Sequence, residues 1–546
     1  YGKSEREVEK IEKEFLEMLT SLKFLPNSPT LMNAGTNFGQ LSACNVLPLE
    51  DSMESIFETI KNAAIVQKFG GGTGFSFSKL RPRGDKVGST GGIAAGPVFF
   101  LQAFDSALKG IRQAHRRYAT NMGVLHVSHP DIFEFIEAKN QEGLLTTFNI
   151  SVGITDEFME AVKTNGMFKL INPRNNEVVE ILPARKIFDK MAESAWRNGE
   201  PGMIFLDRIN STNSNPVPIF GPIEATNPCG EQPLYGYDSC NLGSIDVSKF
   251  VYNAKIHWDE LRRVVCLAVR FLDNVIDASI YPLKEIEERT KSLRRIGLGV
   301  MGFADMLIKL GIPYNSEKAL EIGEKIIKFI SEEGRNYSVK LAEERGSFPA
   351  FEKSIWKKNG FKCLRNATIT TIAPTSNLSI IAGCSHSIEP LFSIVYVRNV
   401  KDSLGTNLIE VNALFEQVAK EKGFYSESLI KKILKHGGLK NLKEIPDEIK
   451  ELFVTAHDIS PEWHVRMQAA FQKYTDNAVS KTVNLPNSAT IEDVKKIFLL
   501  AYDLGCKGIT VYRDGSRTQQ VIITKTEEDE AEEIIESTGG CATCHL

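Results

Sequence analysis

Several features that mark other classes of protein are missing from this sequence of 546 residues. It has no apolar run long enough to span a membrane, and its start lacks the pattern of a secretory signal peptide. Its 65 Lys and Arg residues are balanced by 69 Asp and Glu residues, so no broad basic surface is available for nucleic acid. We therefore expect a cytoplasmic globular protein that binds neither membrane nor nucleic acid, with any phosphate site confined to a local pocket.

Cysteine is scarce as well. A density this low excludes a disulfide-stabilised secreted fold and favours a reducing, cytoplasmic environment. Most of the thiols are expected to be buried as small apolar side chains. The nine cysteines are Cys44, Cys229, Cys240, Cys266, Cys363, Cys384, Cys506, Cys541 and Cys544.

Helical periodicity alternates with short apolar runs over most of the chain. Ser4 and Glu7 form a capping box that opens a first helix, and Pro26 ends it. Further helices are predicted at residues 131–139, 156–164, 184–197, 259–280, 316–345 and 491–504. The short apolar runs lie at residues 203–206, 369–372, 378–381, 394–397 and 509–511. This alternation is typical of an α/β protein with buried strands.

The end of the chain has a different composition. Seven of the ten residues at 527–536 are acidic, and Ser-Thr-Gly-Gly follows, which predicts a flexible arm. The arm carries Cys541 and Cys544 in a C-x-x-C pair, a spacing that suits thiol–disulfide exchange. A zinc site with His545 would lack a second cysteine pair, and an incidental pair on a disordered tail is the other alternative.

A short polar loop in the middle of the chain concentrates reactive side chains. It reads Asn227-Pro228-Cys229-Gly230-Glu231, and a second thiol follows at Cys240. The proline and the glycine impose an unusual backbone path, which presents the Asn, Cys and Glu side chains together. A nucleophilic cysteine usually has a histidine partner. From spacing alone, a turn with an incidental cysteine is therefore an equal alternative.

Two segments are candidates for a phosphate site. Residues 297–302 fit the pattern G-x-G-x-x-G, but polar residues precede them instead of an apolar strand, so we interpret these glycines as helix-packing positions. Residues 374–377, Pro-Thr-Ser-Asn, lie between two apolar runs, where hydroxyl and backbone N–H groups can hold a phosphate. Taken alone, however, this segment is more often a plain turn.

Together, these segments resemble the catalytic chain of the adenosylcobalamin-dependent (class II) ribonucleotide reductases. The resemblance rests on ordered motifs at residues 24–35, 41–44, 70–75, 227–231, 373–378 and 507–516. It implies a ten-stranded α/β barrel of two parallel five-stranded halves, with the loop at 227–231 inserted as a radical-cysteine finger, plus a helical N-terminal segment. The implied units are the helical segment at 1–40, the barrel at 41–524 and the flexible acidic tail at 525–546. Because the chain opens at Tyr1 instead of Met, we expect a fragment that lacks an N-terminal module.

The resemblance also implies a role for each side chain in the loop. Cys229 would carry the thiyl radical that removes the 3′ hydrogen of the ribose. Glu231 would accept the proton of the 3′-hydroxyl, and Asn227 would hydrogen-bond the sugar hydroxyls. Cys44 and Cys240 would be the reducing dithiol, which protonates the leaving 2′-hydroxyl and ends as a disulfide.

The same resemblance also implies the identity of the reductant and of the substrate. Cys541 and Cys544 would reduce the internal disulfide and be recharged by thioredoxin or glutaredoxin. The substrate, expected to be a ribonucleoside diphosphate, becomes a 2′-deoxyribonucleotide. Its predicted contacts are Ser28, Thr30, Ser42, Ala43, Gly72, Pro374, Thr375, Ser376 and Asn377.

The source of the radical is inferred from missing motifs. Reductases with a separate metal-radical subunit carry an adjacent tyrosine pair, whereas residues 511–515 hold the single Tyr512. No glycyl-radical motif stands near the C-terminus. The resemblance thus implies adenosylcobalamin as the cofactor, with no metal ligands from the chain. A class I-type large subunit is the nearest alternative, and a nucleotide-binding regulator without catalysis is another, which the three-thiol set argues against.

Deoxynucleoside triphosphate effectors are expected at the subunit interface of a homodimer. The loops at residues 81–96 and 139–149 resemble the two regulatory loops of the family, and both are polar and contain glycine. Residues 113–123 depart from the family pattern beside these loops. The allosteric contacts of that segment are therefore not carried over.

Overall fold

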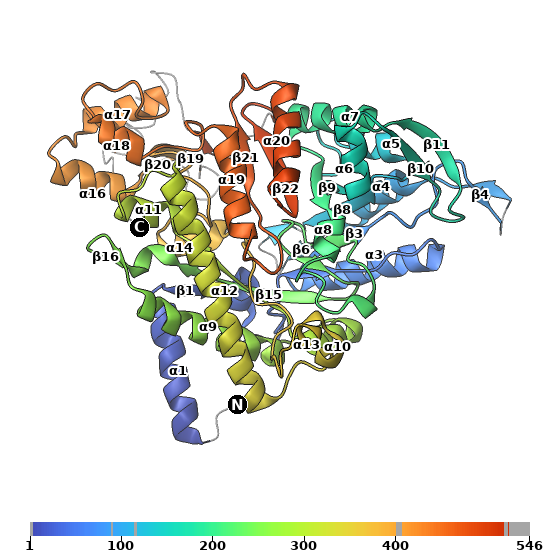
Figure 1. Cartoon of the computed structure of the whole chain (residues 1–546), viewed down its shortest axis with the longest axis horizontal. Helices are drawn as coiled ribbons and strands as arrows, with labels where there is room; N and C mark the ends of the chain where they lie inside the picture. The colour runs from blue at the N-terminus through green and yellow to red at the C-terminus, as the bar shows by residue number, and fades with distance from the viewer. Residues whose placement is uncertain are drawn as a thin grey trace.

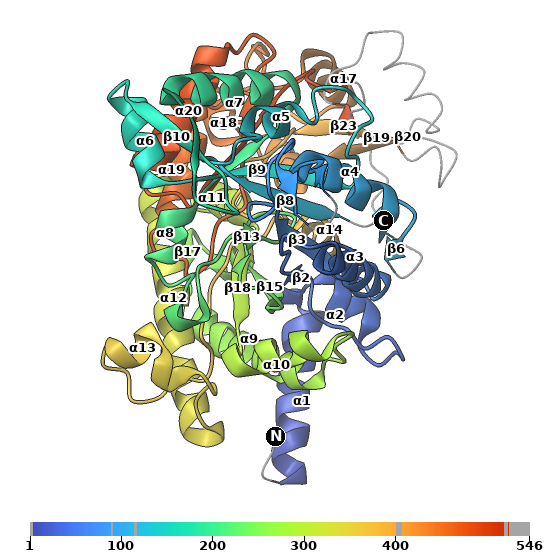
Figure 2. The ribbon, with the colours of Figure 1, turned by 90° about the vertical axis from the view of Figure 1, so that its right-hand side faces the viewer.

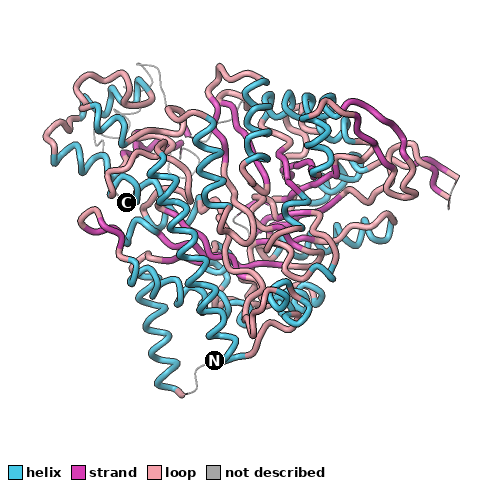
Figure 3. Tube along the Cα trace, in the orientation of Figure 1, coloured by secondary structure: helices cyan, strands magenta, loops and turns pink. Residues whose placement is uncertain are grey.

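The computed structural model describes residues 4–88, 91–113, 117–118, 120–399, 407–517 and 522–523. Its strands gather toward the middle of the molecule and its helices lie around them (Figure 3). The helices are α1 (Glu5–Thr20), α2 (Ser28–Asn33), α3 (Met53–Lys68), α4 (Pro97–Leu108), α5 (Ile132–Glu137), α6 (Asp156–Lys163), α7 (Ala184–Asn198), α8 (Leu206–Asn210), α9 (Trp258–Ala278), α10 (Lys284–Leu293), α11 (Phe303–Lys309), α12 (Glu317–Arg345), α13 (Ile355–Lys358), α14 (Ser376–Ala382), α16 (Ala413–Glu421), α17 (Glu427–His436), α18 (Asp447–Leu452), α19 (Pro461–Gln472) and α20 (Ile491–Asp503).

One sheet of 10 strands forms the centre of the fold. Its strands are β1 (Phe24–Pro26), β2 (Cys44–Val46), β3 (Gly72–Ser76), β8 (Asn121–His126), β9 (Phe148–Ile154), β12 (Gly202–Phe205), β15 (Ser239–Asp246), β18 (Ile296–Met301), β21 (Thr482–Leu485) and β22 (Gly508–Arg513). Strands β2, β3, β8, β9 and β12 are parallel neighbours and form one half. In Figure 2, β9, β8, β3 and β2 follow one another down the molecule.

The second half closes the sheet into a barrel. Its parallel pairs are β15 with β18 and β21 with β22. The parallel bridges Leu298–Thr370 and Ile372–Val479 connect these pairs. The two halves meet in antiparallel pairs, β15 with β2 and β12 with β22. The predicted ten-stranded α/β barrel with two parallel halves is confirmed.

Smaller sheets lie outside the barrel. Paired short strands are β4 (Lys86–Val87) with β5 (Gly92–Ile93), β6 (Arg112–Gln113) with β7 (Arg117–Tyr118), β10 (Met167–Ile171) with β11 (Val178–Pro183), and β16 (Val251–Tyr252) with β17 (Lys255–Ile256). A separate sheet joins β20 (Asn407–Val411), β19 (Val395–Asn399) and β23 (Ile522–Ile523). The predicted strand near residues 394–397 therefore exists, but it lies outside the barrel. Helices α16–α18 lie near this sheet, at the upper left of Figure 1.

Apolar side chains on the helices hold them against the strands. Val265 of α9 and Ile330 of α12 belong to one buried cluster, and Phe188 of α7 packs edge-on against Phe498 of α20 in another. Burying one such side chain contributes about 1.5–3 kcal/mol. The six helices predicted from periodicity are confirmed as α5, α6, α7, α9, α12 and α20.

The N-terminal helix begins as predicted, but it ends at Thr20, before Pro26, which lies in strand β1. Ser4 caps α1, because its hydroxyl accepts a hydrogen bond from the Glu7 backbone N–H at 3.3 Å. The helix projects at the bottom of Figure 1, away from the barrel. Across the described part of the chain, no helix is long and apolar enough to cross a membrane.

Two predictions about secondary structure are wrong. The glycines at 297–302 pack strand β18, not a helix, since a Cβ on Gly299 would lie 2.3 Å from the carbonyl oxygen of Thr371. The apolar run at 378–381 belongs to helix α14, not to a strand. It buries Leu378 and leaves Ile380 and Ile381 exposed, so its apolar residues do not all face the core.

Candidate active site

A two-stranded hairpin presents the loop at 227–231. Strand β13 (Ala225–Thr226) pairs with β14 (Pro233–Leu234), and the loop connects them. Asn227 closes the loop, because its Oδ1 accepts a hydrogen bond from the Gln232 N–H at 2.9 Å. Gly230 has a φ of +82°, a left-handed conformation that favours glycine. Cys229 stands exposed beside it, at the tip.

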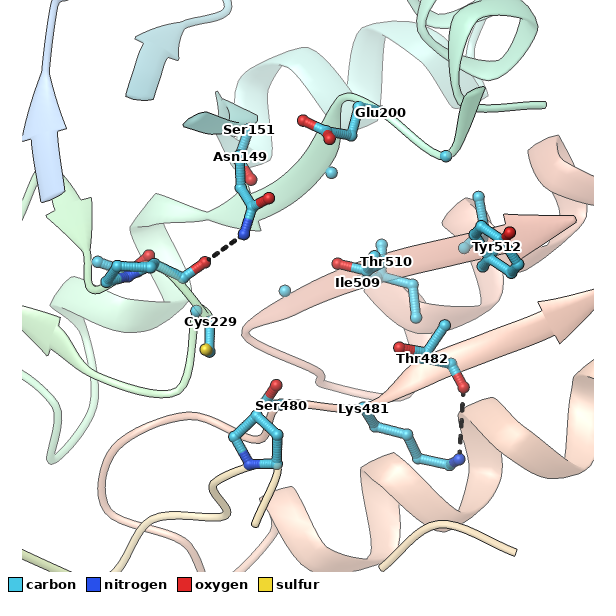
Figure 4. Close-up of a pocket in the computed structure, with 18 of the residues that line it drawn as sticks. Asn149, Ser151, Glu200, Cys229, Ser480, Lys481, Thr482, Ile509, Thr510 and Tyr512 are labelled. Carbon is cyan, nitrogen blue, oxygen red and sulfur yellow. Dashed lines mark hydrogen bonds between the residues drawn. The ribbon is translucent and has the colours of Figure 1, made fainter. Parts of the chain in front are cut away.

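Both halves of the barrel hold this loop. The Asn149 amide of β9 donates to the Pro228 carbonyl at 2.9 Å, a contact drawn dashed in Figure 4. From the other half, the Ala478 N–H and the Thr371 hydroxyl donate to the Glu231 carbonyl, each at 2.9 Å. These bonds fix the loop between the halves.

Glycines in β3 let the hairpin approach closely. A Cβ on Gly74 would lie 1.8 Å from the carbonyl oxygen of Thr226, and one on Gly72 would lie 2.9 Å from the ring of Pro228. Any larger side chain at either position would push the hairpin away. The glycine-rich motif at 70–75 thus makes room for the loop.

Cys44 and Cys240 lie opposite each other on β2 and β15. Directly opposed residues in an antiparallel pair have Cα atoms roughly 4.5–5.5 Å apart, a separation that a disulfide also requires. The residues are 3% and 0% exposed, and burial raises the pKa of both thiols well above the ordinary value. The Asn227 amide lies 3.1 Å from the Cys44 sulfur.

Glu231 is the buried carboxyl of the site. It is 2% exposed, and burial raises its pKa from the ordinary 4.5 to about 7. Within the described part of the chain, its Oε2 atom has no hydrogen-bond partner. A carboxyl group that titrates near neutrality can accept and return a proton under physiological conditions.

A cavity of about 180 Å³, here called the thiol cavity, brings these groups together. Its wall includes Cys44, Asn227, Cys229 and Glu231. It also includes the predicted substrate contacts Ser28, Ala43, Gly72, Pro374, Thr375, Ser376 and Asn377.

Two other predicted contacts, Thr30 and Ser42, are not part of that wall. The hydroxyl of Thr30 donates to the Leu41 carbonyl at 3.0 Å, inside the structure. Ser42 is buried, and its hydroxyl has no partner among the described residues.

Some residues of the thiol cavity were not predicted. Among them, Asn27 caps helix α2 through its Oδ1, which accepts from the Thr30 N–H at 3.0 Å. Leu242 and Ser244 also line the wall. They follow Cys240 at steps of two along β15, a period that places side chains on one face of a strand. Recognising Cys240 as a strand residue would therefore have found both.

A second cavity, of about 460 Å³, meets the first at Pro228, Cys229, Pro374 and Ser376, which line both. We call it the charged cavity, because its wall includes Glu200, His386, Glu389, Lys481 and Arg517. Figure 4 shows the Cys229 thiol at its edge, with Asn149, Ser151 and Glu200 on one side and Ser480, Lys481 and Thr482 on another. Cys229 is thus the thiol that reaches both cavities.

Lys481 is the most buried charge of the charged cavity. Its ammonium contacts Glu389 and lies 3.1 Å from Nδ1 of His464. Burial lowers the pKa of Lys481, an effect that Glu389 opposes. Burial and Lys481 lower the pKa of His464, so His464 is neutral. Its Nδ1 accepts from Lys481, while Nε2 donates to the Ala456 carbonyl at 3.1 Å.

The predicted regulatory loops lie partly in the described structure. The loop at 81–96 contains the hairpin of β4 and β5, and the loop at 139–149 ends at the strand that holds Pro228. Lys139 also pairs with Glu200 of the charged cavity at 2.7 Å. The predicted redox cysteines Cys541 and Cys544 lie outside the described residues, as do parts of the segment 113–123.

Known proteins resemble the chain over nearly its whole length. The family model "Ribonucleotide reductase, barrel domain" matches residues 42–363 and 361–512, and the model "Ribonucleotide reductase, all-alpha domain" matches residues 2–39. A vitamin B12-dependent ribonucleoside-diphosphate reductase of Thermoplasma acidophilum is 54% identical over 527 residues, which cover 96% of this chain and 68% of the relative. One of Mycobacterium tuberculosis is 48% identical, covering 97% and 76%. The structure of a class Id ribonucleotide reductase alpha subunit of Actinobacillus ureae matches with a TM-score of 0.77 at 25% identity, over 93% of this chain and 91% of that one.

Proposed function

The chain belongs to the ribonucleotide reductase family, with vitamin B12-dependent relatives at 48–54% identity, and on that premise we propose how its residues perform the reaction. It reduces ribonucleotides to 2′-deoxyribonucleotides with adenosylcobalamin as the cofactor. The alternative of a class I-type subunit is not favoured, because the class Id alpha subunit is only 25% identical.

The position of Cys229 carries the proposal. A thiol that relays a hydrogen atom must reach the cofactor on one side and the substrate on the other. Cys229 lines both the charged cavity and the thiol cavity, and the loop that presents it is anchored to both halves of the barrel. We assign the thiol cavity to the substrate and the charged cavity to the cofactor.

In the thiol cavity, the Cys229 thiyl takes the 3′ hydrogen of the ribose. Glu231 accepts the proton of the 3′-hydroxyl, and Asn227 holds the sugar hydroxyls. Cys44 and Cys240 then supply two electrons and two protons. The 2′-hydroxyl leaves as water, a C–H bond replaces the C–O bond, and the two sulfurs form a disulfide. Cys229 finally returns the hydrogen to the 3′ carbon, and Glu231 returns the proton to the 3′ oxygen.

The wall of the charged cavity is polar, which suits part of a large polar cofactor. Hydroxyl groups of Ser151, Ser480, Thr482 and Thr510 line it together with charged side chains, and such groups can hydrogen-bond the amides and sugar of a cobalamin. When bound, adenosylcobalamin supplies a weak cobalt–carbon bond whose homolysis starts the hydrogen-atom transfer. Lys481 and Glu389 neutralise each other at the cavity wall, so the buried ammonium stays compensated.

Neutral groups would hold the substrate phosphates. Helix α14 begins at Ser376, and the first N–H groups of a helix have no partner inside the helix. With hydroxyls of Ser28, Thr375 and Ser376 nearby in the wall, they can bind a diphosphate without a Lys or Arg. Thr30 and Ser42 would support this wall from within.

The remaining assignments concern the whole enzyme. We propose a cytoplasmic homodimer regulated by deoxynucleoside triphosphates at the loops 81–96 and 139–149. The chain divides into the helical segment 1–40, the barrel 41–524 and the acidic tail 525–546. Cys541 and Cys544 of the tail reduce the Cys44–Cys240 disulfide and receive electrons from thioredoxin or glutaredoxin.

The decisive experiment is an assay of the purified chain with adenosylcobalamin, dithiothreitol and each ribonucleoside di- and triphosphate in turn. We expect deoxynucleotide from diphosphates without any second protein subunit. Activity that requires a separate metal-containing subunit would favour the class I-type alternative. Nucleotide binding without product, even with all components present, would favour the regulator.

A further inference from the structure

The two thiols of the reducing pair have different surroundings. Cys44 lines the thiol cavity, whereas Cys240 is fully buried and lines neither that cavity nor the charged cavity. An incoming thiol can therefore reach the sulfur of Cys44 through the cavity. Cys240 belongs to a buried apolar cluster.

A buried cation lies beside Cys240. Strands β15 and β18 pair in parallel with Asn241 opposite Ile296, so the preceding residues, Cys240 and Arg295, are also level with each other. Arg295 is 0% exposed. Its guanidinium is 2.7 Å from the Asp238 carboxylate and donates to the Ser214 carbonyl at 3.0 Å.

The charges around the two sulfurs differ in sign. After burial, the largest influence on the pKa of Cys240 is Arg295, which lowers it, while Asp238 and Glu231 raise it. For Cys44, Glu231 and the other two thiols of the site all raise the pKa, and the Asn227 hydrogen bond alone lowers it. Arg295 has no counterpart at Cys44.

We propose that the Cys44–Cys240 disulfide opens in one direction, with the incoming thiolate attacking Cys44 and Cys240 leaving as the thiolate beside Arg295. This inference rests on the proposed function, which makes the two cysteines a redox pair. The access to Cys44 through the cavity and the cation beside Cys240 both favour this direction, because exchange depends on which sulfur can be reached and on how well the leaving thiolate is stabilised. Arg295 is then a positioning residue for the regeneration of the enzyme.

The exchange balances with a dithiol as the reductant. The first thiolate forms a bond to the Cys44 sulfur, the Cys44–Cys240 bond breaks, and Cys240 takes up a proton. The second thiolate of the reductant then attacks its partner sulfur and releases Cys44, which is protonated in turn. The reductant loses two electrons and two protons and becomes a disulfide, and the two cysteines gain both.

Regiochemistry tests the proposal directly. The full chain is oxidised by one turnover and treated briefly with glutathione, a monothiol that stops at the mixed disulfide. The reaction is then quenched in acid, digested and mapped by mass spectrometry. We expect the glutathione adduct on Cys44 to exceed that on Cys240 by about ten-fold or more. Equal adducts, or an excess on Cys240, would overturn the proposal.

Arg295 variants test the role of the cation. Arg295→Met should slow reduction of the disulfide by dithiothreitol and move its pH profile to higher pH. Arg295→Lys keeps the charge and should retain most of the rate and the profile. Identical profiles for the two variants would remove Arg295 from the mechanism. If Arg295→Met does not fold, the adduct map of the unmodified enzyme still decides the direction.

A separate measurement tests the proposed function independently of the direction of disulfide exchange. The prereduced enzyme, given adenosylcobalamin and one equivalent of substrate without external thiol, should form deoxynucleotide and one internal disulfide. No product would refute the proposed function. Product followed by adducts on Cys240 would refute only the direction of exchange.

Discussion

The two cavities that meet at Cys229 bind by different means. The thiol cavity, of about 180 Å³, has no Lys, Arg or His among its described wall residues, and its carboxyl group is Glu231. The charged cavity, of about 460 Å³, has two carboxylates, two cations and a histidine in its wall. A substrate with several negative charges is thus assigned to the cavity without cations.

The need to direct proton transfer gives a physical reason why the thiol cavity has fewer charged side chains than the charged cavity. Among the described wall residues of the thiol cavity, Glu231 is the group that titrates near neutrality, so the 3′-hydroxyl proton has one carboxylate acceptor. The charged cavity needs no such restriction, because only a hydrogen atom is exchanged between Cys229 and a cofactor in that cavity. Its charges can be used for binding. The following experiments separate the two cavities.

The largest effect is expected at the thiol that joins them. Cys229→Ser should reduce deoxynucleotide formation to background, because the O–H bond of serine is too strong to relay a hydrogen atom. Nucleotide and cobalamin binding should both survive, since serine is close to cysteine in size. Product formation measured beside equilibrium binding of both ligands checks this. Turnover near the rate of the unmodified enzyme would contradict the proposal that Cys229 relays the hydrogen atom between the two cavities.

In the charged cavity, Lys481→Met should lower the free energy of unfolding by about 3–5 kcal/mol, because it leaves Glu389 in a partly buried site without its cation. Urea unfolding of the apoprotein measures the change. Lys79→Met is the matched control, since Lys79 forms a surface pair with Glu50 and should cost at most about 1 kcal/mol. Equal losses in the two variants would show that burial of the pair contributes nothing.

In the thiol cavity, Glu231→Gln should remove turnover yet stabilise the protein at high pH. The carboxyl holds its proton more tightly when folded, with a pKa of about 7 against an ordinary 4.5. The free energy of unfolding of the unmodified protein should therefore fall as pH rises through that window, by up to about 3 kcal/mol. The variant should lack this fall. Measuring the free energy of unfolding of both proteins at pH 5 and pH 8 tests this. If both proteins lost the same free energy between these pH values, a group other than Glu231 would be responsible for the loss.

The sequence predicted this site unevenly, for physical reasons. Amphipathic helices such as α9 and α12 were found because one face of each is apolar. Strand β15 was missed, since polar residues such as Ser239, Asn241 and Ser244 interrupt it and leave no apolar run. The loop at Cys229 stood out through its proline and glycine. The charged cavity gave no local signal, because Glu200, Lys481 and Arg517 lie far apart in the chain and meet only when the barrel closes.

The smallest and most selective effect should come from single hydroxyls. Ser28 lines the thiol cavity and Thr510 the charged cavity, and neither lines the other. Losing one neutral hydrogen bond costs about 0.5–1.5 kcal/mol, which is roughly a two- to twelve-fold change in Kd. Ser28→Ala should weaken nucleotide binding by that amount and leave cobalamin binding unchanged. Thr510→Ala should weaken cobalamin binding and leave nucleotide binding unchanged. Calorimetric titration of both variants with both ligands gives four values. If each variant weakened the binding of both ligands equally, the two cavities would have to form one continuous site. The different residues of their walls would then need another explanation.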